Sequence, residues 1–254
     1  MFDVHCHLLP GLDDGPETPE QSLALLRAAM LDGITHIIVT PHIHLGRWEN
    51  DIASIGKAFQ RLARHLPRQK MLQRITIAAE VRLDAEMLPL VAARRVPFLG
   101  RMDGYDVLLL EMPHGRILPG TEKMLRWLKQ RGVLPMIAHP ERNRAILKQP
   151  SRLQSLVDEG CLFQVTAGAL VGQFGERAEQ VARQMLERDL ITVLASDAHN
   201  TRNRPPNLSA GYHRAKALVG EQKARQLVYT RPRALFESNQ FFQLAQGSLS
   251  LAAG

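Results

Sequence analysis

Short apolar runs alternate along this chain with longer amphipathic segments. The apolar runs, rich in Val, Ile and Leu, predict buried strands at residues 2–7, 34–40, 75–80, 106–111, 134–139, 161–165 and 190–196. The amphipathic segments predict helices at 18–33, 85–93, 121–131, 150–159 and 176–188, and a mainly helical stretch at 210–237. Buried strands that alternate with helices favour a parallel sheet with right-handed crossovers.

The ends of the first predicted helix can be assigned from residue types. Thr18 suits the N-cap, Pro19 suits the first helical position, and Gln21 is placed to complete a capping box. Gly33 suits the residue that ends the helix, because glycine adopts the left-handed conformation without strain. Glycine also follows two later predicted helices, with Gly132 after 121–131 and Gly160 after 150–159.

The number of strand–helix units bears on the architecture. Seven predicted strands in one chain of 254 residues fit a (β/α) barrel better than an open, doubly wound sheet. No G-x-G-x-x-G motif follows the first strand, which argues against a dinucleotide-binding fold. We expect a single α/β domain over residues 1–239, followed by a flexible tail at 240–254 that contains Gly, Ser and Ala.

The composition is that of an ordinary globular protein, with 45% hydrophobic and 22% charged residues. Two cysteines, Cys6 and Cys161, give no disulfide framework, which favours the reducing cytoplasm. The N-terminus lacks the basic and apolar regions of a signal peptide. No uncharged apolar run approaches the roughly 20 residues that span a bilayer, so we expect no transmembrane segment.

The net charge of +7 and the pI near 9.8 favour anionic partners such as phosphorylated molecules. The aromatic content of 5% offers few platforms on which the bases of a single strand would stack. We therefore expect no nucleic-acid partner. A homo-oligomer is compatible with the sequence.

Almost every predicted strand ends in a side chain that can bind a metal ion. These candidate ligands are His5, His7, His42, Glu80, Glu111, His139, Asp197 and His199. In a parallel barrel all strands end on one face, where active sites lie, so ligands far apart in sequence converge there. A lone histidine is most often structural, but this many at one end of the fold predict a metal site.

The spacing and chemistry of the ligands support this prediction. His5 and His7 share one face of a strand, whereas Cys6 points away and is expected to be a small buried side chain. Imidazoles and carboxylates without thiolates suit manganese, iron or zinc. A carboxylate such as Glu80 can bridge two ions, as cocatalytic sites for phosphoryl displacement require.

The other histidines are weaker candidates. His44 lies on the same strand face as His42 and is the most plausible alternative to it, and His114 lies in a loop near the barrel mouth, within reach of a substrate. Structural roles are expected for His36, His65 and His213.

Rival phosphatase chemistries lack their motifs. A cysteine-dependent phosphatase needs an arginine six positions after its cysteine, and those positions hold Leu12 and Ala167. A D-x-D-x-[TV] motif and a P-loop are also absent from the sequence. Phosphoryl transfer would therefore depend on metal ions.

Several segments resemble one family, in the same order and with similar spacing up to about residue 238. They are DVHCHLLPGLDDGP at 3–16, TPH at 40–42, AE at 79–80, LE at 110–111, IAHPER at 137–142, ASDAHN at 195–200 and RPP at 204–206. The chain thereby resembles the bacterial PHP-domain (polymerase and histidinol phosphatase) protein-tyrosine phosphatases of capsule and exopolysaccharide operons. The opening block is the most specific of these segments.

The resemblance implies a distorted (β/α)7 barrel, PHP- or TIM-like, with three divalent ions, usually manganese. It implies one ion held by His5, His7, Glu80 and Asp197, a second by Glu80, Glu111 and His139, and a third by Asp14, His42 and His199. It also implies that Arg142 and Arg204 bind the substrate phosphate. Without the resemblance, the segment that contains Asp14 would be read as a plain turn.

The resemblance further implies the reaction and the partner. A metal-bridging hydroxide would attack phosphotyrosine on the Tyr-rich tail of a bacterial tyrosine kinase that controls polysaccharide export. Two alternatives stay open: a small-molecule phosphatase, such as a histidinol-phosphate phosphatase, and a nucleic-acid-directed phosphoesterase or non-catalytic binding module. Glu111, where histidine is common in the wider superfamily, favours the tyrosine phosphatases.

Overall fold

A computed structural model describes residues 1–66 and 74–242 of the chain. Its strands are β1 (Phe2–Cys6), β2 (His36–Val39), β3 (His42–Ile43), β4 (Ile75–Ile77), β5 (Glu80–Arg82), β6 (Gly100–Met102), β7 (Tyr105–Glu111), β8 (Val133–Ala138), β9 (Leu162–Thr166) and β10 (Val193–Ala195). All neighbouring strands run parallel except β6, which forms an antiparallel hairpin with β7.

The parallel strands form a closed barrel. Strand β1 pairs with β2 and β2 with β4, while β3, β5, β7, β8, β9 and β10 pair in that order. The ring closes after β10, where the Asp197 amide donates to the His5 carbonyl at 2.8 Å and the His7 amide donates to the Ala198 carbonyl at 2.9 Å. The predicted α/β barrel is therefore confirmed.

Two of the barrel strands are each split into two short pieces. Pro41 has no amide hydrogen and separates β2 from β3. The ladder nevertheless continues across the gap, because Ala78 donates to Val39 at 2.8 Å and Glu80 donates to Pro41 at 3.1 Å. If β2 and β3 are counted as one strand, and β4 and β5 as another, the barrel has seven strands. The sequence prediction that Glu80 ends its strand is wrong, since Glu80 begins β5.

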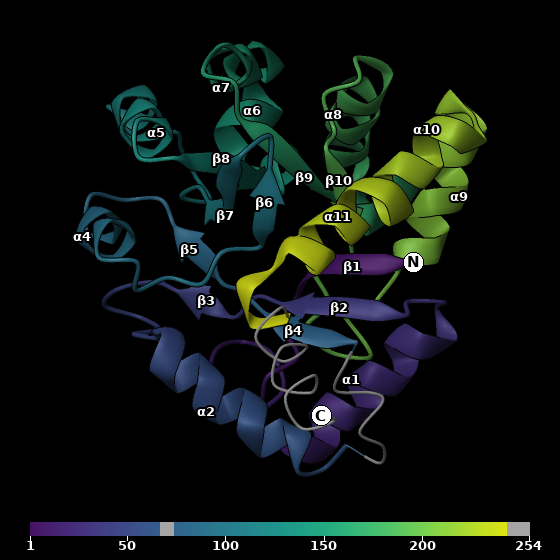
Figure 1. The fold of residues 1–254 in the computed structure, drawn as a ribbon. Coiled ribbons are helices and arrows are strands. Elements are labelled where there is room, and N and C mark those ends of the chain that lie inside the picture. The colour runs from purple at the N-terminus through teal and green to yellow at the C-terminus, as the bar shows by residue number, and fades with distance from the viewer. Residues whose placement is uncertain (67–73, 243–254) are drawn as a thin grey trace.

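Helices surround the barrel (Figure 1). They are α1 (Pro19–Leu31), α2 (Ile52–Ala63), α4 (Met87–Ala92), α5 (Thr121–Lys129), α6 (Arg144–Lys148), α7 (Leu153–Asp158), α8 (Glu176–Glu187), α9 (Leu208–Val219), α10 (Glu221–Arg225) and α11 (Arg231–Ser238). Short 3-10 turns lie at Pro140–Arg142, Pro150–Arg152 and Ala167–Val171, and a π-helical turn lies at Gln226–Thr230. Helices α2 and α6 and strand β6 were not predicted from the sequence.

Helix α1 begins and ends close to the predicted positions. The Thr18 side chain accepts a hydrogen bond from the Gln21 amide at 3.4 Å. The Gln21 side chain, however, accepts from the Glu17 amide at 2.8 Å, one residue before the N-cap. The capping bond is thus present, and the reciprocal half of the predicted capping box is displaced by one residue.

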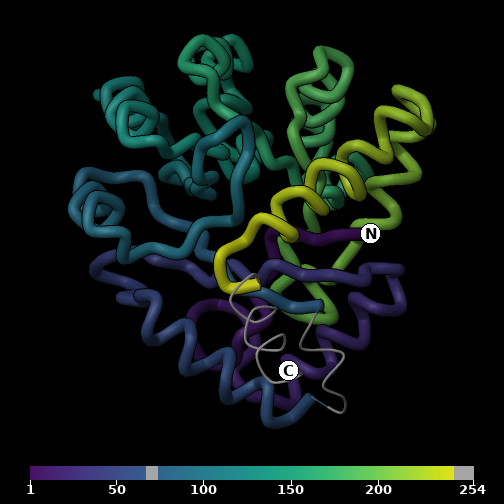
Figure 2. The backbone as a smooth tube through the Cα atoms, in the orientation of Figure 1, coloured from purple at the N-terminus to yellow at the C-terminus, as the bar shows by residue number. Residues whose placement is uncertain are grey.

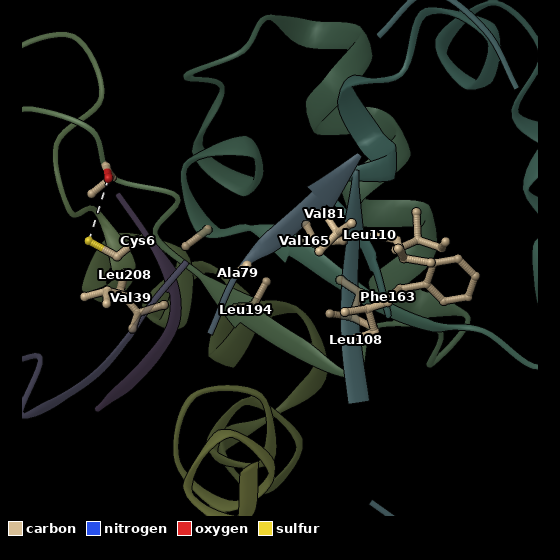
Figure 3. Packing of buried hydrophobic residues seen from close by; sticks show 14 of the residues in the cluster. Cys6, Val39, Ala79, Val81, Leu108, Leu110, Phe163, Val165, Leu194 and Leu208 are labelled. Atoms are coloured by element: carbon tan, nitrogen blue, oxygen red, sulfur yellow. Dashed lines mark hydrogen bonds between the residues drawn. The ribbon is translucent and has the colours of Figure 1, made fainter. Parts of the chain in front are cut away.

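Alternating side chains divide the core into two layers. Along β7, Val107 and Leu109 face the barrel interior, and Leu108 and Leu110 face the helices. Figure 3 shows the outer layer, where Leu108 and Leu110 gather with Phe163 and other apolar side chains. Burying both faces of each strand explains why the strands are continuous apolar runs in the sequence.

Helix α11 covers the end of the barrel where the strands begin. It lies across β1 and β2 (Figures 1 and 2), and its Leu235 and Phe236 join the inner core layer. The buried Asn239 side chain donates to the carbonyls of Ile77, Phe98 and Leu99 at 3.0–3.1 Å. This end is therefore plugged, and the opposite end is left for a site.

The predicted domain boundary at residue 239 stays a prediction. Phe241 and Phe242 still pack against the core, and residues 243–254 of the predicted tail lie outside the described residues. Within the described part of the chain, no helix has both the length and the apolar character needed to cross a bilayer.

Candidate metal centre

The predicted ligands lie together at the open end of the barrel, where the strands end. They are His5 in β1, His7 just after it, His42 in β3, Glu80 in β5, Glu111 at the end of β7, His139 after β8, and Asp197 and His199 after β10. Asp14 joins them from the loop between β1 and α1. All of these residues belong to groups whose donor atoms lie within 4.8 Å of one another.

Four buried donors form the tightest group. His5 Nε2 lies 3.3 Å from His7 Nε2, 3.1 Å from Glu80 Oε2 and 3.3 Å from Asp197 Oδ1. His7 Nε2 lies 3.3 Å from the same Glu80 oxygen and 3.5 Å from the same Asp197 oxygen. Ligands about 2.1 Å from a tetrahedral ion are about 3.4 Å apart. The spacing of these atoms thus fits one shared cation.

Asp14 brings a second group together. Its Oδ1 lies 3.2 Å from His199 Nε2 and 3.5 Å from His42 Nε2, and His7 completes the group. This is the set that the family resemblance implies for one ion, with His7 added.

The remaining donors group differently from the implied set. Glu111 lies with His42 and Glu80, whereas His139 lies with His5 and Asp197. His139 Nε2 is nevertheless 2.7 Å from Glu80 Oε1. Glu80 therefore offers one oxygen toward His5 and the other toward His139, as a bridging carboxylate does.

Three features of this cluster fit metal ions and fit poorly with hydrogen bonds alone. The Nε2 atoms of His5 and His7 face each other at 3.3 Å. Asp197 Oδ1 and His199 Nε2 are buried, and their close neighbours His5 Nε2 and Asp14 Oδ1 do not have hydrogen-bonding geometry toward them. Such orphaned groups are costly unless a bound ion satisfies them. The donors are imidazoles and carboxylates, which bind manganese, iron and zinc.

Two outer side chains orient the histidines. Asp13 Oδ2 lies 2.7 Å from His7 Nδ1 and also accepts the His42 amide at 3.0 Å. Gln164 Oε1 lies 2.9 Å from His5 Nδ1. With Nδ1 held by an acceptor, Nε2 of each ring is free to bind an ion. Sequence reasoning missed both residues, although Asp13 precedes Asp14 and Gln164 is the one amide in an apolar strand.

Charges within the cluster determine the protonation of its carboxylates. Burial alone would raise the pKa of Glu80, but the positive charges of His5 and His42 outweigh it and hold the pKa well below its usual range. For Glu111, burial and the charge of Glu80 raise the pKa. Burial and the charge of Arg142 lower the pKa of His139 to about 4, so the imidazole is neutral and available as a ligand.

Arg142 and Arg204 converge on one carboxylate oxygen. Asp197 Oδ2 accepts from the Arg142 guanidinium at 2.5 Å and from the Arg204 guanidinium at 2.6 Å. Burial acts to raise the pKa of Asp197, but the charges of Arg142 and His5 outweigh it and hold it well below its usual range. The other oxygen of Asp197 faces the histidines, so Asp197 connects the arginines to the cluster.

Two of the ligand candidates have unusual backbone geometry. His139 has a φ of 34° and Asp197 a φ of 51°, in the left-handed region that residues other than glycine rarely occupy. His139 directly follows β8 and Asp197 lies two residues after β10, so each sharp turn redirects the chain at the barrel mouth. Such strain is concentrated at functional sites.

The cluster opens into a cavity of about 590 Å³, which is the usual size of a small-ligand site. Arg142 and Arg204 line it, together with the aromatic rings of Trp48 and Phe174. Trp48 stacks on His42 with ring centres 4.5 Å apart, and the Arg142 guanidinium lies 4.7 Å from the centre of the Phe174 ring. Sequence reasoning found neither aromatic residue, because no spacing pattern marks them.

The other histidines have separate positions. His44 and His114 line the cavity, but neither belongs to a donor group, and His42 occupies the position for which His44 was the alternative. His36 stacks on Phe2 with ring centres 4.3 Å apart, and the ring of His65 bonds the Arg61 carbonyl at 2.9 Å. His213 lies beside Tyr212 on α9, away from the cavity.

The chain matches a family model described as capsular polysaccharide synthesis, CpsB/CapC, over residues 1–237. It is 34% identical to the tyrosine-protein phosphatase YwqE of Bacillus subtilis over 223 residues, which cover 88% of this chain and 84% of that protein. It is 30% identical to the tyrosine-protein phosphatase CpsB of Streptococcus pneumoniae over 245 residues, 92% of this chain and 98% of that protein.

Solved structures agree with these matches. A crystal structure from a study of YwqE and CpsB, described as metal-dependent tyrosine phosphatases, matches this chain with a TM-score of 0.85 at 30% identity. The match covers 95% of this chain and 96% of the other. A histidinol phosphate phosphatase from Lactococcus lactis matches with a TM-score of 0.51 at 14% identity, which shows a shared fold alone. The resemblance read from the sequence motifs is confirmed: the chain belongs to the CpsB/CapC family of capsular polysaccharide synthesis.

Proposed function

We propose that this chain is a metal-dependent protein-tyrosine phosphatase that acts on a bacterial tyrosine kinase in polysaccharide synthesis. The names of its relatives support the activity, and the family description supports the process. One observation carries the proposal: two arginines meet a buried metal-type donor cluster inside one cavity. Phosphate recognition and metal chemistry are thus combined at a single point.

Three divalent ions, with manganese favoured, are proposed for the nine clustered donors. His5, His7, Glu80 and Asp197 would hold one ion and Asp14, His42 and His199 another, while Glu111 and His139 would hold the third with Glu80. When bound, the ions activate a water as the nucleophile and neutralise the charge that develops on the phosphoryl oxygens.

The chain's own side chains would bind and orient the substrate. Arg142 and Arg204 offer planar, forked donors suited to two oxygens of one phosphate. Phe174 and Leu147 line the same cavity and offer apolar surface for the ring of a tyrosine. The tyrosinate leaving group has a pKa of about 10, so its departure depends less on a proton from a general acid than the departure of an alkoxide would.

The activity test compares three substrates: a phosphotyrosine peptide, histidinol phosphate and an oligonucleotide, each with manganese and with chelator. We expect phosphate release from the peptide, dependent on manganese. Histidinol phosphate is included because a phosphatase of that substrate shares the fold. A higher kcat/KM for histidinol phosphate would overturn the proposal.

Substitutions test whether the phosphatase activity depends on the donor cluster. Asp197→Asn is expected to lower kcat/KM by more than about 100-fold, beyond the loss typical of outer partners of a metal site. Asp158→Asn on the exposed end of α7 makes the same chemical change outside the cavity and serves as the control. Bound manganese, counted by elemental analysis, should fall in Asp197→Asn alone. Full metal content in that variant would contradict the assigned ligand role.

A further inference from the structure

The cavity contains more positive charge than one phosphate requires. Besides Arg142 and Arg204, its wall carries the charges of Arg47 and Arg144 and the imidazole of His114, and none of these three residues belongs to the donor groups. Arg47, Arg144 and His114 are all exposed to solvent. They form a basic rim outside the cluster.

No carboxylate on the cavity wall balances this basic rim. The acidic residues that line the cavity are Asp14, Glu80 and Glu111, and each belongs to a donor group. Arg82 also lines the wall, but it pairs with Glu111 at 3.0 Å. Among the described residues, neither Arg47 nor Arg144 has a carboxylate oxygen within 4.0 Å.

The side of the rim that carries Arg144 and His114 is built on a rigid base. The Arg144 amide donates to the His114 carbonyl at 2.9 Å, which joins the start of α6 to the loop after β7. The buried Asn143 side chain donates to the Pro113 carbonyl at 2.8 Å and accepts from the Ala145 amide at 3.0 Å. Arg144 and His114 are thus held next to each other at the mouth.

The electrostatics of His114 reflect these neighbours. Burial, and then the charges of Arg144 and Arg142, lower the pKa of His114. The charge of Arg82 acts in the same direction, and no carboxylate opposes it. An anion at this wall would therefore meet a positive potential that the protein itself leaves uncompensated.

The other side of the rim is Arg47. Its guanidinium lies 3.9 Å from the centre of the Trp48 ring, and the same ring stacks on His42. Stacking on an aromatic face restricts an exposed arginine without using its hydrogen-bond donors. The donors of Arg47 are therefore available to a ligand at the cavity mouth.

We infer that Arg47, His114 and Arg144 form a second anion subsite, which binds an acidic group of the substrate peptide next to the phosphotyrosine. This inference rests on the proposed function and specifies its substrate: a peptide with negative charge flanking the target residue. A flanking Asp or Glu carboxylate and the phosphate of a second phosphotyrosine offer the same chemistry.

The test compares phosphotyrosine peptides that differ only in their flanks, with manganese-loaded enzyme: neutral flanks, acidic flanks, and a neighbouring second phosphotyrosine. The measured quantity is kcat/KM for each charged peptide relative to the neutral one. We expect a preference of about tenfold for charge, equivalent to 1.4 kcal/mol, which weakens as salt is added. The peptide with the higher ratio identifies the preferred anion.

Substitutions test whether the preference for charged peptides depends on the basic rim. Arg144→Ala and Arg47→Ala should each lower the ratio by about threefold or more, as expected for partly exposed charge pairs. Arg27→Ala removes the same charge from an exposed position on α1 and should keep the wild-type ratio. Equal kcat/KM for all peptides, or an unchanged ratio in both rim variants, would overturn the inference.

A binding measurement separates this inference from the proposed function. Fluorescence anisotropy with phosphonate analogues of the same peptides reports affinity without turnover. If no peptide is hydrolysed, the proposed phosphatase activity is wrong, and the affinities still decide whether the rim selects acidic flanks. Tighter binding of the acidic analogue that is lost in Arg144→Ala supports the subsite, and equal affinities refute it.

Discussion

Arg142 donates a 2.5 Å hydrogen bond to Asp197, a residue 55 positions later in the chain. Arg142 belongs to the turn after β8 and Asp197 follows β10, and the parallel pairing of both strands with β9 brings their C-terminal ends together. The same carboxylate faces His5 and His7 through its other oxygen, at 3.3 and 3.5 Å. The arginines proposed to bind phosphate and the donors proposed to bind ions therefore share one side chain, so a loss of charge on one side is expected to affect the other.

Arg142→Lys should retain the positive charge but remove the forked donor. We expect kcat/KM for a phosphotyrosine peptide to fall by roughly 10–100-fold, the range for losing one charge-assisted hydrogen bond, and KM to rise. The manganese content should not change, because the ammonium group still faces Asp197. Wild-type kinetics in this variant would show that Arg142 does not bind the phosphate in a forked manner.

Asp13→Asn tests the outer partner of His7. The carboxylate lies 2.7 Å from His7 Nδ1, and an amide in its place loses the negative charge that makes the imidazole a stronger ligand. We expect the affinity for manganese, measured by calorimetry, to fall by about 10–100-fold, while circular dichroism stays unchanged. An unchanged affinity would reduce Asp13 to a structural role in the loop after β1.

Removing the ions should lower the thermal stability. Ligand binding to the folded state at 100 times Kd stabilises it by about 2.7 kcal/mol, which corresponds to about 5–10 °C in Tm for a chain of this size. Scanning calorimetry with manganese and with chelator measures the difference. An identical Tm in both conditions would argue that the clustered donors do not hold ions.

Thiol reagents should leave the activity intact. Burial raises the pKa of the Cys161 thiol to about 12 and that of Cys6 well above its usual value, so neither is a thiolate at neutral pH. Both side chains are also inaccessible, at 8% and 1% exposure. Incubation with iodoacetamide at pH 8, followed by an activity assay, checks this. Rapid inactivation would instead indicate an essential cysteine.

The barrel could be predicted from the alternation of apolar and amphipathic segments, and most of the cluster from the metal-binding side chains at the ends of the predicted strands. A strand alternates its faces, so His5 and His7 were expected on one side and Cys6 on the other, as observed in the packing of Cys6 with the outer core. Asp14 was different. It lies in a loop, where no periodicity applies, and only the family resemblance pointed to it.

The parts that the sequence did not predict depend on tertiary contacts. Glu80 was assigned to the end of a strand, yet it begins β5, because pairing with His42 and Leu109 continues the ladder past the gap. Gln164 reads as an ordinary polar residue until the barrel closes and places it 2.9 Å from His5. Neither hydropathy nor spacing contains that information, which arises from distant strands.

Gly100 tests the plugged end of the barrel independently of the metal centre. It adopts a φ of 157°, and an added Cβ would lie 2.1 Å from the Leu235 carbonyl oxygen of α11, a backbone atom. Gly100→Ala must therefore displace α11, and with it Phe236 in the inner core layer. We expect a loss of about 2–4 kcal/mol in the free energy of unfolding, measured in urea, from overpacking and backbone strain together.

Gly56 provides the matched control for this change. It lies within α2, where an added Cβ would meet nothing within 4 Å, so Gly56→Ala should stabilise the fold by about 0.5–1 kcal/mol through helix propensity. Manganese content should match the wild type in both variants, because the donors lie at the opposite end of the barrel. If Gly100→Ala proved as stable as Gly56→Ala, the tight contact between β6 and α11 would be wrong. If it lost manganese while remaining folded, the two ends of the barrel would be coupled, and the separation of a stabilising end from a metal-binding end would not hold.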